Sequence, residues 1–277
     1  MTLSIVQLPI STLLPYPITV VLPKDVRAMA GRAWLLAGSP SEPMSVVEMD
    51  ARTNQFQVIQ RSSGLRVEES ALSMPRSLEY PTEGGAESHA LFYSPKNGAF
   101  EGPPGERPPL VVMIHGGPTA SARSSFSAEI QFFTSRGFAV LDVHYGGSTG
   151  FGRQYRERLH GAWGVVDVDD CAKGALFLAD KGLADRKRLA IRGGSAGGFT
   201  TLAALAFRDV FTAGASAYGV SDLGALARDT HKFEARYLDR LVGPYPGRKD
   251  LYDARSPLLH AERIKARHGS ALQSPSD

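Results

Sequence analysis

The chain reads Ile191-Arg192-Gly193-Gly194-Ser195-Ala196-Gly197-Gly198 where a short apolar segment gives way to an alanine-rich one. Residues 188–193 have the composition of a buried strand and residues 196–208 that of a helix, so the glycines mark a tight turn between them. The spacing Gly-x-Ser-x-Gly in a strand–turn–helix context is typical of an exposed serine nucleophile. Residues two before and two after the serine must be small, because their Cβ atoms would collide in such a turn.

Ser195 is the candidate nucleophile that this pattern indicates. The turn exposes its hydroxyl at the carboxyl edge of the sheet and places the free amides of a helix N-terminus beside it. The alternative interpretation is a serine N-cap in a glycine-rich turn, which arises often by chance. The strand before Ser195, the helix after it and a second motif favour catalysis.

The second motif is His115-Gly116-Gly117-Pro118, which ends the apolar run 110–114. In the α/β-hydrolase fold, this position supplies one amide of the oxyanion hole, and the residue after the nucleophile supplies the other. We therefore assign the oxyanion hole to the backbone N–H groups of Gly116 or Gly117 and of Ala196. His115 itself precedes the serine, whereas the catalytic histidine of this fold follows it, so we interpret its side chain as structural.

Apolar strands alternate with helical segments after residue 108, which predicts a mostly parallel sheet covered by helices, the α/β-hydrolase fold. Before this region the pattern is that of short antiparallel strands separated by turns. The expected strands are 33–37, 45–49, 55–60, 76–80, 88–94, 109–115, 138–145, 188–193 and 213–219, and the expected helices are 124–136, 167–181 and 196–208.

Composition excludes several classes of protein. Of 277 residues, 43% are hydrophobic and 21% charged, which is typical of a folded domain, and a net charge of +3 without long basic runs argues against nucleic-acid binding. Cys171 is the single cysteine, so neither an internal disulfide nor a multi-cysteine metal site is possible. No apolar stretch is long enough for a membrane helix, and the apolar N-terminus lacks the positive charges of a signal peptide. We expect a soluble cytoplasmic protein that binds no membrane.

Two further segments suggest ligand sites and fail closer inspection. The glycine-rich loop 145–153 matches neither nucleotide-binding glycine pattern, so it predicts no phosphate site. Asp167, Asp169 and Asp170 are better explained as residues that favour the positive end of a helix, with Asp167 as its N-cap. We expect no cofactor and no metal.

Together these motifs resemble the prolyl oligopeptidase family of serine peptidases, in particular its acylaminoacyl-peptidase and dipeptidyl-peptidase-like branch. The resemblance covers about residues 32–264 and rests on five segments in order: 115–118, 145–152, 163–170, 193–198 and Ser256-Pro257. It implies a β-propeller before the hydrolase domain, and residues 1–65 resemble a remnant of its last blade. The expected domains are this remnant and a catalytic domain at 66–277.

The C-terminal residues depart from the family pattern. The resemblance implies a catalytic Asp and then a His on loops after two further strands, yet residues 265–277 contain no strand-like run, so we expect a fold incomplete at this end. Asp222 is a possible replacement for the acid, and His231, His260 and His268 are weak candidates for the base. A serine without its base is a poor nucleophile, so we expect a peptidase of short peptides whose activity is impaired.

Two other functions remain open at the level of sequence. One is an inactive fragment or pseudoenzyme that at most binds peptides or a partner, and the other is a small-molecule esterase, because esterases share both motifs. The apolar run 213–218 contains no charge or proline, so as an edge strand it predicts self-association and marginal folding.

Overall fold

The computed structural model describes residues 20–21, 26–230 and 236–265 and divides the chain into two compact units. The N-terminal unit contains residues 1–74 and 123–132, and the C-terminal unit contains residues 75–122 and 133–277. The division lies close to the boundary expected after residue 65, but the return of segment 123–132 to the first unit was not expected. The assignment of separate roles to 1–65 and 66–277 stays a prediction.

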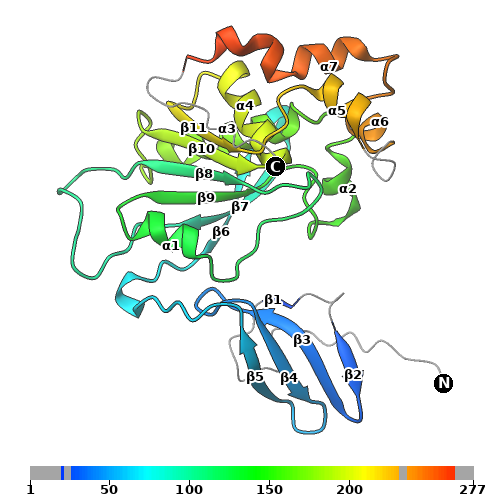
Figure 1. Ribbon diagram of the computed structural model, residues 1–277. Coiled ribbons are helices and arrows are strands. Elements are labelled where there is room, and N and C mark those ends of the chain that lie inside the picture. Colours follow the sequence, from blue (N-terminus) through cyan, green and yellow to red (C-terminus); the bar gives the residue numbers. More distant parts are fainter. Residues whose placement is uncertain (1–19, 22–25, 231–235, 266–277) are drawn as a thin grey trace. The chain divides into compact units, whose positions relative to one another are not determined.

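The N-terminal unit is built on an antiparallel sheet with the order β1-β3-β4-β5, in which β2 also pairs with β3 (Figure 1). Leu35, Ala37 and Val47 form its small buried core. The turn between β4 and β5 is fixed by Asp50, whose carboxylate accepts the amides of Arg52 and Thr53. The three strands expected here are confirmed as β3 Arg32–Gly38, β4 Ser45–Asp50 and β5 Gln55–Arg61. Two short strands, β1 Val20–Val21 and β2 Arg27–Met29, were not expected.

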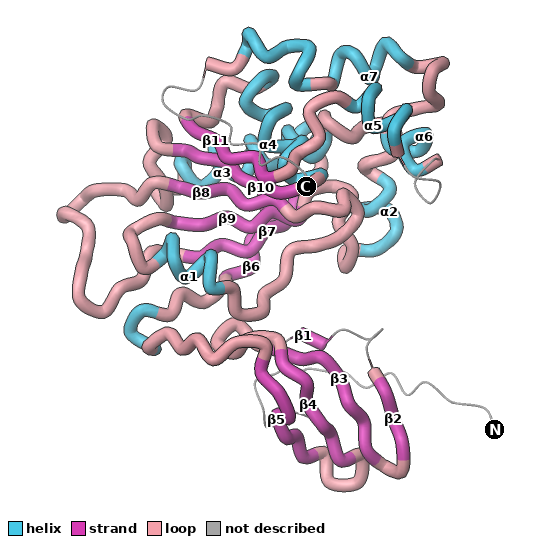
Figure 2. The backbone as a smooth tube through the Cα atoms, viewed as in Figure 1, coloured by secondary structure: helices cyan, strands magenta, loops and turns pink. Residues whose placement is uncertain are grey.

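The C-terminal unit contains a six-stranded sheet with the order β11-β10-β8-β9-β7-β6 (Figure 2). Neighbours among β8, β9, β10 and β11 run parallel, and the β6–β7 hairpin joins antiparallel to β9. This mostly parallel sheet confirms the α/β-hydrolase fold. Its strands are β6 Arg76–Pro81, β7 Glu87–Tyr93, β8 Leu110–Ile114, β9 Ala139–His144, β10 Leu189–Gly194 and β11 Ala213–Ala217.

Two helices cover the sheet next to the candidate site. Helix α3 packs on β6 to β9, α4 packs on β8, β10 and β11, and the two helices touch each other. Every residue of β8 is buried, because this strand has neighbours on both sides. The helices are α1 Ala128–Thr134, α2 Gly152–Glu157, α3 Val166–Asp180, α4 Ala196–Phe207, α5 Leu223–Asp229, α6 Tyr237–Leu241 and α7 Lys249–Arg255, with short 3-10 turns at Glu69–Ala71, Glu83–Gly85 and Pro257–Arg263.

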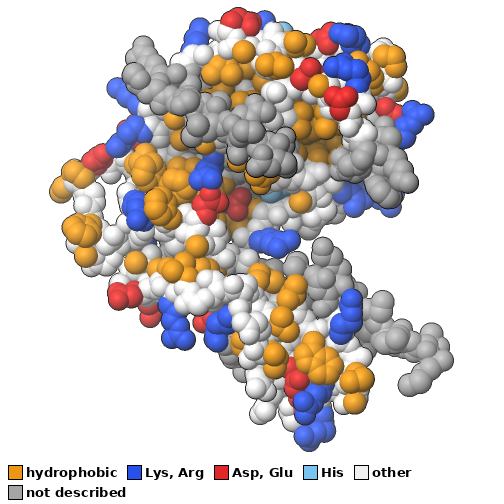
Figure 3. Space-filling model, viewed as in Figure 1, with side chains coloured by type: hydrophobic (Ala, Val, Ile, Leu, Met, Phe, Trp, Pro, Cys, Tyr) orange, Lys and Arg blue, Asp and Glu red, His pale blue; other side chains and the backbone are white. Residues whose placement is uncertain are grey.

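The surface carries mixed charge (Figure 3), and the described helices are not of the membrane-spanning kind. On the face drawn in Figure 3, basic and acidic side chains are interspersed. Within the described ranges, no helix is long and apolar enough to cross a membrane, and no group of three or more His, Cys, Asp or Glu side chains could hold a metal ion.

Candidate active site

Ser195 lies alone between the end of β10 and the start of α4. Its backbone has φ +55° and ψ −122°, a conformation that costs a non-glycine residue free energy and persists only when the surrounding structure enforces it. Its amide donates to the carbonyl of Ala217 at the end of β11, 3.1 Å away. The strained turn therefore has the geometry that a nucleophile on a strand–helix corner requires.

The glycines around Ser195 are required by contact as well as by conformation. A Cβ on Gly193 would lie 2.5 Å from the backbone of Gly197, and a Cβ on Gly197 would lie 2.4 Å from the carbonyl oxygen of Ile114. Real Cβ atoms do not approach backbone so closely, so both positions exclude every larger residue. The contact between Gly193 and Gly197 is the collision that the spacing predicted.

The His115–Pro118 loop reaches Ser195 because β8 and β10 are parallel neighbours. A Cβ placed on Gly116 would be 3.6 Å from the Cβ of Ser195 and 3.2 Å from the carbonyl oxygen of Gly194. Gly117 has φ +122°, which favours glycine. The fold thus gathers the proposed oxyanion donors Gly116, Gly117 and Ala196 around one serine, while the assignment of the N–H groups stays a prediction.

Tyr145 and Ser148, on the loop after β9, hold the His115–Pro118 loop in place. The Tyr145 hydroxyl donates to the carbonyl of Pro118 at 2.7 Å, and its ring stacks on that of His115 with centroids 4.3 Å apart. Nε2 of His115 lies 2.7 Å from Oγ of Ser148, and Nδ1 lies 2.9 Å from the carbonyl of Gly116. A carbonyl can only accept, so Nδ1 carries the proton and Nε2 accepts from Ser148.

Burial lowers the pKa of His115 to about 4, so its ring is neutral at neutral pH. Both ring nitrogens already have partners within the loops. This arrangement supports the structural interpretation of His115. The sequence contained the glycine-rich loop 145–152, but nothing in it indicated that Tyr145 would hold the His115–Pro118 loop in place.

A small pocket of about 90 Å³ opens beside Ser195. Its walls come from segments far apart in sequence: the His115–Pro118 loop, the turn before α3, the start of α4 and helices α5 and α6. Most of the lining is apolar or aromatic, from Pro118, Trp163, Ala196, Val220, Leu226, Tyr237 and Leu238. A mostly apolar pocket of this kind next to a candidate nucleophile suits one uncharged side chain of a ligand.

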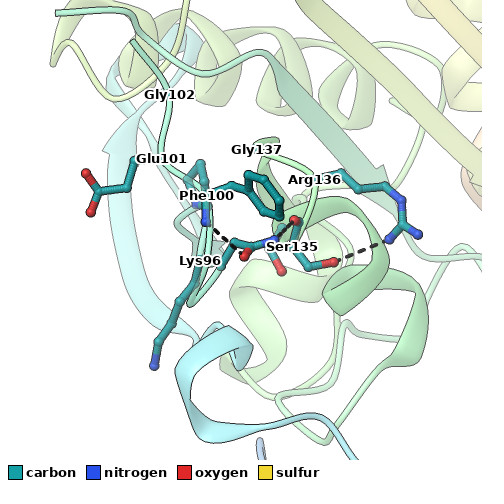
Figure 4. Close-up of a pocket in the computed structure, with 10 residues that line it drawn as sticks. Lys96, Phe100, Glu101, Gly102, Ser135, Arg136 and Gly137 are labelled. Atoms are coloured by element: carbon teal, nitrogen blue, oxygen red, sulfur yellow. Dashed lines mark hydrogen bonds between the residues drawn. The ribbon is translucent and has the colours of Figure 1, made fainter. Parts of the chain in front are cut away.

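A larger, open hollow of about 930 Å³ lies elsewhere on the C-terminal unit. It is formed by the loop 95–102 and the turn 134–137, and Asn97 joins the two by donating to the carbonyl of Ser135 at 2.8 Å. Figure 4 shows Lys96 and Glu101 pointing outward from it. It shares no lining residue with the pocket at Ser195, so it gives no argument about the chemistry there.

Residues 124–274 match the prolyl oligopeptidase family, which is more than half of the chain. The chain belongs to the prolyl oligopeptidase family of serine peptidases. Dipeptidyl aminopeptidase BIII of Pseudoxanthomonas mexicana is 30% identical over 237 residues, covering 83% of this chain and 30% of the relative. Acylamino-acid-releasing enzyme 1 of Oryza sativa subsp. japonica is 28% identical over 236 residues, covering 82% of this chain and 28% of the relative.

Solved structures of the same family agree with the fold. A puromycin-hydrolyzing peptidase of Mycobacterium tuberculosis superimposes with a TM-score of 0.90 at 45% identity, covering 94% of this chain and 39% of that protein. An acylaminoacyl peptidase of Pyrococcus horikoshii superimposes with a TM-score of 0.73 at 25% identity, covering 90% of this chain and 38% of that protein. The chain thus spans roughly a third of these family members, and its antiparallel N-terminal sheet fits a β-propeller blade.

The side chains considered as a possible acid or base have other partners in the described part of the chain. Asp222 is the N-cap of α5, where its carboxylate accepts the amides of Gly224 and Ala225. His260 donates from Nε2 to the carbonyl of Asp253 at 3.1 Å. Within the described ranges, neither pairs with Ser195. His231 and His268 lie outside the described residues.

Asp167 supports the site through hydrogen bonds. It does not cap α3, although the sequence had suggested that it would. The N-cap is Val165, and Asp167 follows it in the first turn. The buried carboxylate of Asp167 accepts the amide of Gly164 at 2.6 Å and the hydroxyl of Thr200 on α4 at 2.5 Å. Desolvation raises its pKa to about 6 despite these hydrogen bonds. The N-cap prediction was wrong because this side chain ties two elements together.

Asp170 plays a similar part for the loop after β9. Its buried carboxylate accepts the amide of Gly146 at 2.7 Å and the hydroxyl of Thr82 at 2.6 Å, and it pairs with Arg158 at 3.1 Å. Because Gly146 follows Tyr145 directly, this carboxylate also helps to fix the tyrosine that holds the His115–Pro118 loop. The carboxylate of Asp170 therefore has its partners within the fold.

Proposed function

We propose that Ser195 is the nucleophile of a serine peptidase that cleaves short peptides through an acyl-enzyme. The observation that carries this proposal is the strained Ser195 turn, which sits beside Gly116 and opens on the 90 Å³ apolar pocket. In the reaction, Oγ attacks the scissile carbonyl carbon, and the N–H groups of Gly116 or Gly117 and Ala196 bind the resulting oxyanion. The C–N bond then breaks as the leaving amine takes up the proton that the Ser195 hydroxyl has lost. Water later hydrolyses the acyl ester, which releases a carboxylic acid and restores the hydroxyl.

The step that limits this chain is removal of the proton from the Ser195 hydroxyl. In the described residues, no histidine is hydrogen-bonded to Ser195, and His115 and His260 have other partners. A nucleophile with an oxyanion hole but no base retains an acceleration of about 10³–10⁴ over water. We therefore propose that the chain turns over peptides far more slowly than a peptidase whose serine is hydrogen-bonded to a base.

The same observation favours a second candidate function, a module that binds peptides without cleaving them. Both functions use the pocket at Ser195, so they differ in turnover and not in recognition. The names of the relatives, a dipeptidyl aminopeptidase and acylamino-acid-releasing enzymes, support a substrate with a free or acylated amino end a few residues from the scissile bond.

Turnover of matched substrates tests the proposal. The purified chain and its Ser195→Ala variant are incubated with a free-amine dipeptide anilide, an N-acylated peptide anilide and p-nitrophenyl acetate. We expect slow anilide release that Ser195→Ala abolishes. Binding without Ser195-dependent release would favour the binding module, and release from the acetate alone would favour an esterase.

A further inference from the structure

We propose that Tyr237 is a positioning residue that links the pocket beside Ser195 to the His115–Pro118 loop. A substrate side chain that fills the pocket then speeds the attack by Ser195 as well as strengthening binding. The inference rests on the proposed function, because it takes this loop as the oxyanion loop and the pocket as the subsite for the residue before the scissile bond.

Tyr237 contacts two parts of the site. The residue lines the pocket at Ser195. Its hydroxyl donates to the carbonyl of Gly117 at 3.3 Å and lies 2.9 Å from Oγ1 of Thr119. A tyrosine hydroxyl has one proton, so the threonine is the donor in the second hydrogen bond. One side chain of the pocket wall is therefore bonded to the loop on both sides of Pro118.

Helix α6, which begins with Tyr237, is anchored in the C-terminal unit. Leu241 at its end is only 1% exposed and belongs to the core. The amide of Gly161 donates to the carbonyl of Arg240 at 2.9 Å. The amide of Trp163 donates to the carbonyl of Leu241 at 3.1 Å. A helix held by packing and by these hydrogen bonds gives the tyrosine hydroxyl a fixed origin.

The loop is held through its carbonyls. Three successive carbonyls, at residues 116–118, each accept a hydrogen bond from a side chain. The first accepts from Nδ1 of His115, and the third accepts from the hydroxyl of Tyr145. The middle one, that of Gly117, accepts from Tyr237. Loss of this donor would loosen the centre of the loop, next to the amides that we assign to the oxyanion hole.

The direction of those amides affects the rate more than it affects binding. During the attack by Ser195, negative charge builds up on the carbonyl oxygen, and a donor stabilises it only when it points at that oxygen. Binding energy accelerates a reaction where it is realised in the transition state. A side chain that packs on Tyr237 in the pocket keeps the tyrosine hydroxyl on the loop. Filling the pocket should therefore raise the rate constant of acylation.

The volume sets the size of a suitable probe. About 90 Å³ corresponds to roughly three waters, each with a share of about 30 Å³ in the liquid. The propyl side chain of norvaline has three heavy atoms and matches that space, whereas the methyl side chain of alanine leaves most of it empty. The p-nitrophenyl esters of N-acetylnorvaline and N-acetylalanine differ only in this side chain.

Single-turnover kinetics with these two esters separate binding from acylation. The full chain is kept in excess over each ester, and release of p-nitrophenolate gives a dissociation constant and an acylation rate constant. Oγ of Ser195 forms the new ester bond, p-nitrophenolate leaves as an anion, and the serine proton passes to water. Ser195→Ala gives the background rate.

Four variants isolate the hydrogen bonds of Tyr237. Tyr237→Phe keeps the ring and removes the hydroxyl. Thr119→Val removes the threonine donor, and Thr119→Ser retains it. Tyr245→Phe controls for the loss of a tyrosine hydroxyl, because that hydroxyl accepts a hydrogen bond from an exposed arginine, Arg228. Far-UV circular dichroism checks that each variant is folded.

We expect the acylation rate constant of the parent to be about three- to tenfold higher for the norvaline ester than for the alanine ester, the range that one net hydrogen bond provides. Tyr237→Phe should bring this ratio to about one without weakening binding of the norvaline ester. Thr119→Val should lower the ratio, and Thr119→Ser and Tyr245→Phe should retain it.

Three results would overturn the inference and leave Ser195 as the nucleophile. They are a parent ratio near one, a ratio that survives Tyr237→Phe, and a loss in Tyr237→Phe that appears only in the dissociation constant. A parent chain that releases p-nitrophenolate no faster than Ser195→Ala would contradict the proposed function, and the inference would fall with it.

Discussion

At the scale of single residues, the site depends on contacts that tolerate no added atoms. Gly197 shows this most clearly, since a Cβ there would lie 2.4 Å from the carbonyl oxygen of Ile114 on β8. Relief of this overlap would have to move β8 or the start of α4, and both contribute to the proposed oxyanion hole. Gly197 is therefore needed both for the stability of the fold and for the placement of β8 and α4 at the site.

We expect Gly197→Ala to lower the free energy of unfolding by about 1–3 kcal/mol, the usual cost of overpacking a tight site. Urea unfolding followed by circular dichroism measures the change. Gly102→Ala is the matched control, because nothing lies within 4 Å of a Cβ at Gly102 and its φ is not positive. Equal stability of the two variants would show that the turn around Ser195 is packed less tightly than its contacts indicate.

Tyr145 gives a second prediction at this scale. Tyr145→Phe keeps the stacking on His115 but removes the donor to the buried carbonyl of Pro118, which should cost about 1–3 kcal/mol of stability. The measurement is again urea unfolding, with Tyr245→Phe as control, because the Tyr245 hydroxyl accepts a hydrogen bond from an exposed arginine, Arg228. If both variants lose the same stability, the Tyr145 hydroxyl has no special role.

Sequence reasoning at the residue scale worked where a local pattern fixed the geometry. Gly193, Ser195 and Gly197 lie within five positions, so their spacing alone predicted the turn. Asp167 was misassigned as a helix cap because its partner Thr200 lies 33 positions away on another helix. Trp163 was noted only as part of a motif, since the pocket that it lines is assembled from distant segments.

At the scale of elements, strand β11 is the feature with the clearest consequence. Within the described sheet it is an edge strand, paired with β10 alone, and Ala215 and Ala217 are exposed. Unpaired N–H and C=O groups on an uncharged edge are a template for another chain. We propose that the 277-residue chain self-associates through this edge.

Ala215→Lys tests this proposal by placing a charge on the exposed edge. Light scattering coupled to size-exclusion chromatography should show oligomers of the parent chain that increase with concentration, and a shift toward monomer in the variant. Ser63→Lys, at an exposed position in the N-terminal unit, controls for added charge. A parent chain that stays monomeric at high concentration contradicts the proposal.

Strands β3 to β11 and the longer helices could be predicted, and the short helices could not. Strands β3 to β11 agree with the expected apolar runs to within about two residues, because buried strands need continuous or alternating apolar residues. Helix α1 is shorter than expected, and helices α2, α5, α6 and α7 were not predicted. They have only five to seven residues each, too few for a hydrophobic period to be recognised.

At the scale of the whole molecule, buried titratable groups link stability to pH. Burial lowers the pKa of His115 and of His144 to about 4 from 6.5, so unfolding takes up protons between these values and stability falls as the pH drops from 6.5 to 4. Asp167 acts in the opposite direction, because its raised pKa of about 6 gives stability that is present in acid and lost as the pH rises through 6. The two histidines together outweigh the one carboxyl.

The expected net effect is a lower free energy of unfolding at pH 4.5 than at pH 6.5, with at most about 1.4 kcal/mol per pH unit for each group. Urea unfolding at several pH values measures the slope. His144→Phe should flatten it, since the substitution removes one of the two groups whose pKa burial lowers. A slope of the opposite sign would mean that Asp167 dominates.

The central claim, that Ser195 is the reactive residue of the molecule, is tested most directly by fluorophosphonate labelling of the purified chain with peptide mapping by mass spectrometry. The account predicts one adduct, slowly formed, on Ser195, and none at that site in Ser195→Ala. Modification of another serine at an equal or higher rate, or no adduct on Ser195 after prolonged exposure to excess reagent, would contradict it.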